Sequence, residues 1–323
     1  MDKFKVGIIG CGDIGFIFDY NKKIDGALTH FKAFNNSSKF EVKAIAETRK
    51  EIREIIKNEY DIKTYKSYEK MLEENELDVV VVATNDETHF EILKKLVHHK
   101  PKLVFSEKPL ACNFKEADVI AKLYDKNKIP LQVNFTRRFL DEFMDIDYIV
   151  KNKKIGEIES ATFYYSRGLI HNASHYLDLV LWYFGKPEKV LSISSVKGVS
   201  KIDNTMSFNL SYTNGPEVRF IGLKPTKVSF GEIDLVGTNG RVKVNYKNEI
   251  ENYKVIENKL FKGYSSYKMY KCRTIQFSRA LLYAAENIYK VLKKEDEPRS
   301  PAINSLKIFE LINRIKDNPL WQN

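Results

Sequence analysis

The sequence has few cysteines, and none of them form a recognisable pattern. The three that it has, Cys11, Cys112 and Cys272, lie far apart and show no C-x-x-C spacing. This argues against a structural zinc site and against a disulfide framework. Such cysteine usage fits a protein of a reducing compartment.

Long apolar runs are also absent. No segment approaches the roughly 20 apolar residues that a membrane-spanning helix needs. The N-terminal stretch MDKFKVGIIG is charged at its start, and its apolar part is too short for a signal peptide. We therefore expect a cytoplasmic protein with no membrane partner.

Blocks of like charge are missing, although the chain is basic. Lysine and arginine number 53 against 43 acidic residues, which gives a net charge of +10. The lysines are spread along the chain and mixed with acids, as in KVLKKEDEPR. Without a run of roughly five or six like charges, we expect a lysine-rich surface and no nucleic-acid partner. A basic surface would also attract anionic small ligands such as dinucleotides and sugar nucleotides.

The first part of the chain alternates strand-like and helix-like segments. Alternation on this scale predicts βαβ units and a doubly wound parallel sheet. DVVVVAT (78–84) is nearly all β-branched, as strands buried on both faces are. The other predicted strands are 5–10, 40–47, 102–110 and 128–135, and the predicted helices are 48–60 and 113–128.

After residue 135 the pattern changes to helices flanking many strands. Two Asn-Gly turns, in TNGPE and GTNGR, predict hairpins within the strand-rich stretch 189–256. We expect a C-terminal α+β domain with an open, mostly antiparallel sheet, so that 1–134 is a Rossmann domain and 135–323 a substrate-binding and oligomerisation domain. The remaining predictions are helices over 138–152, 173–184, about 270–294 and about 302–316, and a strand over 158–168.

Residues 10–15 read GCGDIG, a G-x-G-x-x-G pattern directly after the first predicted strand. Gly10 would permit a tight turn, Gly12 would let the backbone approach a pyrophosphate, and Gly15 would let helix and strand pack closely. Asp13 and Ile14 lie between them at the expected helix N-terminus, which favours anions. The position after a strand makes this a predicted dinucleotide site.

The acidic partner of such a site closes the second strand, and here that residue is Glu47. It comes later than the usual ~20 residues after the glycines, and we attribute the excess to an insertion around DYNKKIDGALTH (19–30). A carboxylate there would bind the ribose hydroxyls and repel a 2′-phosphate, which favours NAD. Arg49 follows closely, however, and could accommodate NADP.

SEKPL (106–110), downstream of this glycine pattern, resembles a motif of the Gfo/Idh/MocA family of sugar and cyclitol oxidoreductases. Further segments match the family in order, namely VVVATNDETH (80–89), NFTRRF (134–139), the stretch around His175 with LWYFG, and IDLVGTNGRV (233–242). The resemblance covers nearly the whole chain. It implies NAD(P)-dependent hydride transfer to or from a carbinol or ketone carbon of a sugar, inositol or sugar nucleotide.

The resemblance also implies residue roles. Lys108 would hydrogen-bond the reacting oxygen and stabilise alkoxide charge, Glu107 would hold Lys108 or serve the structure, and the Lys-Pro bond is often cis in this family. Arg137, where the chain leaves the Rossmann domain, would hold a hydroxyl or phosphate of the ligand. The segment after the 78–84 strand should lie near the cofactor, and its candidate residues are Thr84, Asn85 and His89.

RGLIHNASHYLD (167–178) places His171, His175 and Asp178 at helical spacings. A metal site would need a third ligand, and neither an HExxH glutamate nor a nearby cysteine is present, so we predict no metal. The family carries Asp-x3-His here. His175 therefore remains the candidate acid–base group, while His171 replaces the aspartate and becomes a candidate for substrate binding or relay, with packing as the alternative. Asn172 and Asp178 are further substrate-side candidates.

Together these features predict an oxidoreductase that takes NAD, or NADP, and a small sugar or sugar-nucleotide substrate. Lys108 and His175 are the expected catalytic residues. A non-catalytic NAD-binding regulatory or scaffold protein is the alternative, because the family aspartate is missing. Exposed strands of the second sheet are expected to pair between copies, giving a homodimer or homotetramer.

Overall fold

The structure, a computed structural model, describes residues 3–200, 203–224 and 230–317. The strand-rich stretch 189–256 includes residues 201–202 and 225–229, and these lie outside the described residues. The chain divides into two compact units. The first comprises Met1–Leu140 and Gln276–Leu306, and the second comprises Asp141–Ile275 and Lys307–Asn323.

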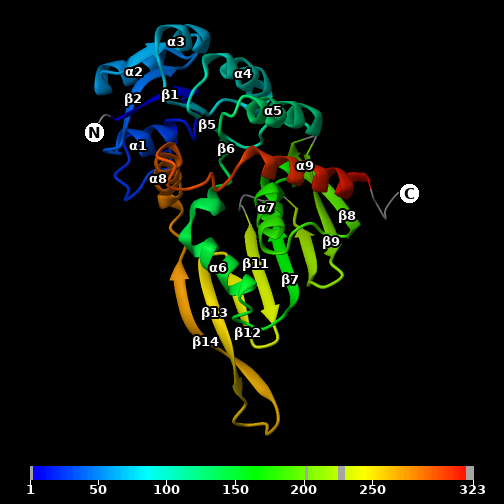
Figure 1. The fold of residues 1–323 in the computed structure, drawn as a ribbon. Helices are drawn as coiled ribbons and strands as arrows, with labels where there is room; N and C mark the ends of the chain where they lie inside the picture. Colours follow the sequence, from blue (N-terminus) through cyan, green and yellow to red (C-terminus); the bar gives the residue numbers. More distant parts are fainter. Residues whose placement is uncertain (1–2, 201–202, 225–229, 318–323) are drawn as a thin grey trace. The chain divides into compact units, whose positions relative to one another are not determined.

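The first unit is built on a parallel six-stranded sheet of order β3-β2-β1-β4-β5-β6 (Figure 1). This confirms the predicted doubly wound sheet. The central strand β4 is buried along its whole length, as its run of four valines predicts. The strands are β1 Phe4–Ile9, β2 Phe40–Ala46, β3 Lys63–Tyr65, β4 Val79–Val82, β5 Leu103–Ser106 and β6 Leu131–Val133.

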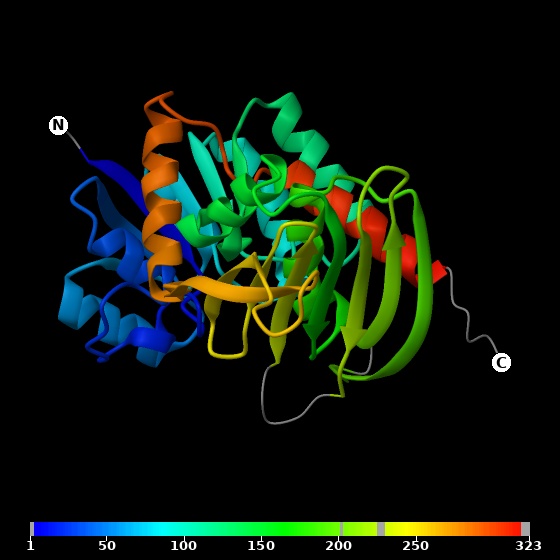
Figure 2. The same cartoon turned by 90° about the horizontal axis from the view of Figure 1, so that it is seen from below.

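Helices connect these strands and bury apolar stripes against the sheet. On one face, α1, α2 and α8 contribute buried residues to a single core cluster with β1 and β2. Figures 1 and 2 show α8 beside α1, although the two are far apart in sequence. The helices of this unit are α1 His30–Asn35, α2 Lys50–Tyr60, α3 Tyr68–Glu74, α4 His89–Leu96, α5 Phe114–Lys126 and α8 Ala280–Leu292; α9 spans Ala302–Asp317.

The helix expected directly after the glycines is split in two. One helical turn forms, in which the N–H of Phe16 donates to the carbonyl of Gly12 at 2.9 Å. The chain then leaves the helix, and the carbonyls of Ile14 and Gly15 accept instead from the N–H groups of His30 (2.9 Å) and Phe31 (3.0 Å). In an unbroken helix these carbonyls would bind the residues four places on. Segment 17–29 is therefore an insertion into the helix, which explains the late position of Glu47.

Polar contacts hold the insertion at both ends. The buried carboxylate of Asp19 accepts from the N–H of Leu28 and from the hydroxyl of Thr29, both at 2.6 Å. Thr29 in turn caps α1 by accepting from the N–H of Lys32. The N–H of Ala27 donates to the carbonyl of Ser278 at 2.7 Å, which ties the loop to the segment before α8.

The second unit is an open eight-stranded sheet of order β14-β13-β12-β11-β7-β10-β9-β8. Its pairs are antiparallel except β7 with β10, which agrees with the predicted mostly antiparallel sheet. The alternating burial of β7 and the ring contact of Phe163 with Tyr176 show that α7 packs on one face. The elements are α6 Asp141–Lys151, β7 Ile158–Tyr165, α7 Ser174–Tyr183, β8 Lys189–Ser200, β9 Asp203–Ser211, β10 Glu217–Gly222, β11 Gly231–Gly237, β12 Gly240–Val244, β13 Glu249–Glu257 and β14 Ser265–Thr274.

The two Asn-Gly turns lie where the sequence predicts them, between β9 and β10 and between β11 and β12. The predicted helix over 270–294 was wrong in its first part. Residues 265–274 form the edge strand β14, which pairs with β13, and α8 begins only at Ala280. β14 is exposed along nearly all its length, so it lacks the one-sided apolar alternation that would have marked it as a strand.

The assignment of residues 276–306 to the second domain was also wrong, because this segment belongs to the first unit. Leu281, Ala284, Ala285 and Ile288 of α8 are buried in the same cluster as β1 and β2. Their spacing predicts an amphipathic helix but does not reveal which sheet the helix covers.

Ile288→Ala is expected to lower the free energy of unfolding by about 2–5 kcal/mol, because it opens a cavity in the first unit. Ile288 is 0% exposed, whereas Ile303, in α9 of the same unit, is 50% exposed. Ile303→Ala is therefore the matched control and should change stability by no more than about 0.5 kcal/mol. Urea unfolding measures both, and equal losses would contradict the packing of α8.

Candidate active site

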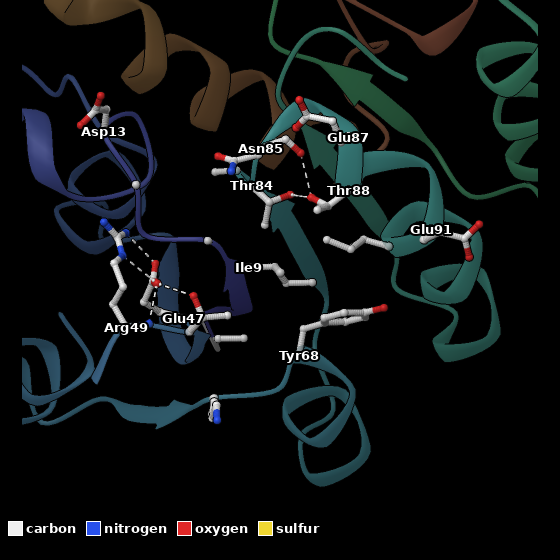
Figure 3. A pocket seen from close by; sticks show the side chains of 17 residues that line it. Ile9, Asp13, Glu47, Arg49, Tyr68, Thr84, Asn85, Glu87, Thr88 and Glu91 are labelled. Carbon is white, nitrogen blue, oxygen red and sulfur yellow. Dashed lines mark hydrogen bonds and ion pairs between the residues drawn. The ribbon is translucent and has the colours of Figure 1, made fainter. Parts of the chain in front are cut away.

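A cavity of about 850 Å³ lies at the carboxyl ends of β1, β2 and β4 in the first unit. Ligands of open α/β sheets bind at this edge. Figure 3 shows Glu47 and Arg49 meeting at one side of it, with Thr84, Asn85 and Thr88 along another. The lining residues are Ile9, Gly10, Gly12, Asp13, Ala46, Glu47, Thr48, Arg49, Lys66, Tyr68, Ala83, Thr84, Asn85, Glu87, Thr88, Glu91 and Ile92.

The glycine loop has the geometry that the sequence predicts. Gly10 has a φ of +92°, and a Cβ there would lie 2.6 Å from the carbonyl oxygen of Ala83. A Cβ on Gly15 would lie 2.3 Å from the carbonyl oxygen of Gly10, so turn and helix approach too closely for a side chain. A Cβ on Gly12 would have open space, since nothing other than its chain neighbours lies within 4 Å of it. The loop is therefore tight at its ends and open in the middle, where a diphosphate would approach the backbone.

Glu47 directly follows β2, as predicted, but its carboxylate already accepts hydrogen bonds from other residues of the chain. Oε2 accepts from the N–H of Cys11 at 2.8 Å and from Nη2 of Arg49 at 2.9 Å. Oε1 accepts from the N–H and from Nε of Arg49, both at 2.9 Å. Arg49 also donates to the carbonyl of Cys11, so the pair secures the glycine loop to the end of β2.

Burial by itself raises the pKa of Glu47, because it removes water from the charged form. Hydrogen bonds from the side chain and backbone of Arg49 and from the N–H of Cys11 outweigh burial and lower the pKa to about 2. Glu47 is therefore ionised at neutral pH, and its charge is compensated by a guanidinium whose side chain is 45% exposed.

The segment after β4 is ordered by its own polar groups. The hydroxyl of Thr88 donates to that of Thr84 at 2.7 Å, and the N–H of Thr88 donates to the carbonyl of Asn85 at 3.0 Å. His89 is fully buried at the start of α4. Its Nδ1 lies 2.7 Å from the carbonyl oxygen of Pro109, and its Nε2 lies 3.1 Å from that of Thr84. His89 thus joins this segment to the turn that carries Lys108.

Lys108 follows β5, and its peptide bond to Pro109 is cis, as the resemblance implied. Glu107 beside it is buried. Its Oε1 lies 2.7 Å from Nε2 of His30 and accepts from Nδ2 of Asn134 at 2.6 Å, while Oε2 accepts from the N–H of Lys108 at 3.3 Å. Burial opposes ionisation, but the contacts with His30 and Asn134 and the charge of Lys108 hold the pKa of Glu107 below its ordinary value.

Six predicted cofactor residues line the cavity, and the others do not. Those that line it are Gly10, Gly12, Asp13, Glu47, Thr84 and Asn85. Glu107 and Lys108 follow β5, the strand next to β4, and so lie at the same edge of the parallel sheet. Ile14, Gly15 and His89 do not line the cavity; Gly15 and His89 act through packing and backbone contacts.

In the second unit, His171 and Asn172 belong to a π-helical turn, Leu169–Ala173, that precedes α7. The buried carboxylate of Asp203 accepts from the N–H groups of Ile170 (2.9 Å) and His171 (2.8 Å). The side chain of Asn172 donates to the carbonyl of Ser166 at 2.8 Å. Asp203 is not among the predicted site residues, because no sequence pattern connects residues 32 positions apart.

The predicted α-helical spacing of His171, His175 and Asp178 applies only to the last two, because His171 lies in the π-helical turn before α7. His175 is half-buried in the first turn of α7, and Asp178 is buried one turn later. Among residues 3–200, 203–224 and 230–317, no group of three or more His, Cys, Asp or Glu side chains could hold a metal ion. In the same ranges no helix is long and apolar enough to cross a membrane.

Arg137 lies in the 3₁₀ turn Thr136–Phe139 of the first unit. Its guanidinium lies 5.6 Å from the ring centre of Phe277, a distance typical of a cation–π contact. The same segment supplies Asn134 to Glu107. The end of β6 therefore contributes to the turn that carries Lys108.

The fold and this edge of the sheet define a Rossmann-type dinucleotide-binding domain. Residues 4–135 match the model of an oxidoreductase family with an NAD-binding Rossmann fold, Gfo/Idh/MocA. This match confirms, over residues 4–135, the resemblance to the Gfo/Idh/MocA family seen in the sequence.

Two relatives match about half of the chain. Myo-inositol 2-dehydrogenase of Thermotoga maritima is 30% identical over 155 residues, which is 47% of this chain and 42% of that protein. Inositol 2-dehydrogenase of Rhizobium meliloti is 26% identical over 160 residues, or 49% and 44% of the two chains. The match thus spans less than half the length of these curated relatives.

Solved structures share the fold over 98% of this chain. An oxidoreductase from Agrobacterium radiobacter, solved with NAD⁺, L-tartaric acid and magnesium, aligns with a TM-score of 0.77 at 16% identity, covering 98% of this chain and 96% of that one. The WlbA dehydrogenase from Bordetella pertussis, solved with NADH and UDP-GlcNAcA, aligns with 0.78 at 18% identity, covering 98% and 95%.

The residues present fit a dinucleotide. Gly12 leaves open backbone where a diphosphate would lie, and the cavity continues from there to the end of β2, where Glu47 and Arg49 meet. Thr84 and Asn85 lie on the side of β4, toward the strand that leads to Lys108. These residues would hold the two halves of the cofactor at the strand ends.

The contribution of Glu47 to stability should depend on pH. Because its pKa in the folded state is about 2, below the ordinary value of 4.5, ionised Glu47 stabilises the folded state above pH 4.5. That stabilisation is lost as the pH falls from 4.5 toward 2. The difference in free energy of unfolding between the natural chain and Glu47→Gln should therefore shrink between about pH 5 and about pH 3.

Urea unfolding at several pH values tests this expectation. Glu51→Gln removes an exposed carboxylate from α2 and provides the baseline. A difference for Glu47→Gln that stays constant over the same pH range would contradict the ion pair with Arg49.

Proposed function

We propose that this chain is an NAD-dependent dehydrogenase or reductase acting on a hydroxyl or keto carbon of a sugar, cyclitol or nucleotide-linked sugar. One observation carries the proposal. Lys108 follows β5 at the edge of the sheet that holds the glycine loop, and the adjacent Glu107 is buried and bound by His30 and Asn134. A lysine in this place can interact with a substrate oxygen beside a bound dinucleotide.

Bound NAD would supply the hydride acceptor. The chain's own residues bind and orient the substrate and manage its proton. Lys108 donates a hydrogen bond to the reacting oxygen and stabilises the negative charge that develops there. His175 is proposed to exchange the hydroxyl proton, and His171, Asn172, Arg137 and Asp178 to contact the substrate; these roles rest on the sequence pattern.

The proposed substrate class rests on the relatives. Two of them are named as inositol dehydrogenases, and a neighbour of the same fold was solved with UDP-GlcNAcA. Cyclitols and sugars share rings of secondary hydroxyl groups, each of which can be oxidised to a ketone. The basic surface favours a phosphorylated or nucleotide-linked sugar over a neutral one.

NAD is the proposed preferred cofactor, and Glu47 is the reason. A carboxylate at the end of β2 disfavours a 2′-phosphate. Arg49 offsets this preference, since its guanidinium balances Glu47 and is half-exposed beside the cavity. Discrimination against NADP should therefore be moderate, and NADP is proposed as a slower alternative.

We also propose a cytoplasmic homodimer or homotetramer without nucleic-acid or membrane partners. The connection between β13 and β14 exposes Leu260 (86%), Phe261 (63%) and Tyr264 (70%), side chains that association would remove from water. Light scattering at micromolar concentration should give at least twice the mass of one chain. The mass of a single chain would contradict this proposal.

Absorbance of the reduced nicotinamide, followed with a panel of inositols, sugars and sugar nucleotides, tests the activity. Turnover is expected with at least one member and is expected to be faster with NAD than with NADP. Lys108→Ala should lower kcat by about 10²–10³-fold, because it removes the donor to the reacting oxygen. The Kd of NAD, measured by calorimetry, should stay nearly unchanged.

Lys126→Ala, at an exposed lysine at the end of α5, is the control and should keep full activity. Full activity of Lys108→Ala would refute the role of this lysine. NAD binding without turnover of any panel member would favour the regulatory or scaffold alternative.

A further inference from the structure

His30 is a buried residue that neither the glycine pattern nor the EKP motif includes. It is the first residue of α1 and is 0% exposed. Its ring packs edge-on against Phe105 of β5, with ring centres 5.1 Å apart. It therefore lies beneath the turn that carries Lys108, and it reaches this place directly after the insertion at 17–29.

Two contacts make His30 a link between two loops. Its backbone N–H donates to the carbonyl of Ile14 in the glycine loop at 2.9 Å. Its Nε2 lies 2.7 Å from Oε1 of Glu107. Because Glu107 is ionised, Nε2 carries the proton and donates.

Only a few groups compensate the carboxylate of Glu107. The groups that face it are His30 from α1, Asn134 from the segment after β6, and Lys108 from its own turn. A buried carboxylate stays charged only when donors or positive charges compensate it. The positive charge of Lys108 attracts Glu107 when that carboxylate is ionised, so the two groups are electrostatically coupled.

We propose that His30 is a positioning residue: through Glu107 it holds the Lys108 turn in place and joins that turn to the glycine loop. The inference rests on the proposed function, since it assigns His30 a part in turnover by Lys108. His30 would act on Lys108 through Glu107, without contacting the substrate or the dinucleotide itself.

The shape of the imidazole allows a sharp test. The amide nitrogen of glutamine can occupy the place of Nε2, whereas that of asparagine reaches only as far as Nδ1. In the structure it is Nε2 that binds Glu107, and Nδ1 has no hydrogen-bond partner. His30→Gln should therefore preserve the contact, and His30→Asn should break it, while both variants place a similar polar amide in the same buried space.

Kinetics of the full-length chain should separate the two variants. His30→Asn should lower kcat by about tenfold or more and move the acidic limb of the pH profile upward by about one unit. The limb moves because Glu107 with fewer donors is protonated at a higher pH. His30→Gln should keep kcat within about threefold of the natural chain and leave the pH profile in place. His98→Asn, at an exposed histidine of the turn after α4, is the control.

A double variant shows whether His30 acts through Glu107. If it does, His30→Asn combined with Glu107→Gln should be no slower than Glu107→Gln alone. Equal impairment by Asn and Gln at position 30, or multiplying losses in the double variant, would assign His30 to the stability of the core and overturn the proposal. So would a natural pH profile in His30→Asn.

A second readout does not depend on turnover. Acetylation of Lys108 by acetic anhydride, mapped by mass spectrometry with Lys126 as the internal reference, reports on the surroundings of the amine. The rate at Lys108 should rise in His30→Asn and stay unchanged in His30→Gln, because only the former breaks the contact with Glu107 that holds the Lys108 turn in place. Equal rates in both variants would overturn the inference. The natural chain could show no turnover while the acetylation rate at Lys108 still differs between His30→Asn and His30→Gln. That result would reject the proposed function and leave the inference about His30 standing.

Discussion

A carboxylate taken out of water has to be compensated, and two such carboxylates organise the functional edge of the first sheet. Glu47 at the end of β2 is compensated by Arg49 and the N–H of Cys11. Glu107 after β5 is compensated by His30, Asn134 and the N–H of Lys108. Each carboxylate also binds a part of the chain that is distant in sequence, since Cys11 lies 36 residues from Glu47 and His30 lies 77 residues from Glu107. The shape of the site follows from meeting these two requirements at one edge.

The same requirement recurs in the second unit. Asp203 of β9 binds the first N–H groups of the turn that leads into α7 and so sets the start of the segment containing His171 and His175. The carboxylate that the family pattern carries at position 171 is absent from the sequence, yet a carboxylate from another strand binds the backbone at that position. It acts on the backbone of the segment, so it does not simply replace the missing side chain.

Much of the fold could be predicted, because β4 is a continuous β-branched run, strand-like and helix-like segments alternate around it, and the glycine loop has a strict pattern of steric demands. The first sheet and the tight turn at Gly10 follow directly from such local signals. Packing partners could not be predicted in the same way. The apolar stripe of α8 would suit either sheet, and the exposed strand β14 shows no alternation. Contacts such as that of His30 with Glu107, 77 residues apart, leave no periodic trace in one sequence.

The split helix after the glycines shows how a chain can change length at a place where its geometry must not change. The hydrogen bonds from His30 and Phe31 back to Ile14 and Gly15 put the two donor residues in the places that residues 18 and 19 would take in an unbroken helix. The segment itself is anchored by the buried residues Asp19, Ala27 and Thr29, so the chain on either side of it keeps its place. Such a junction lets a helix take in an extra loop without moving the residues on either side of it.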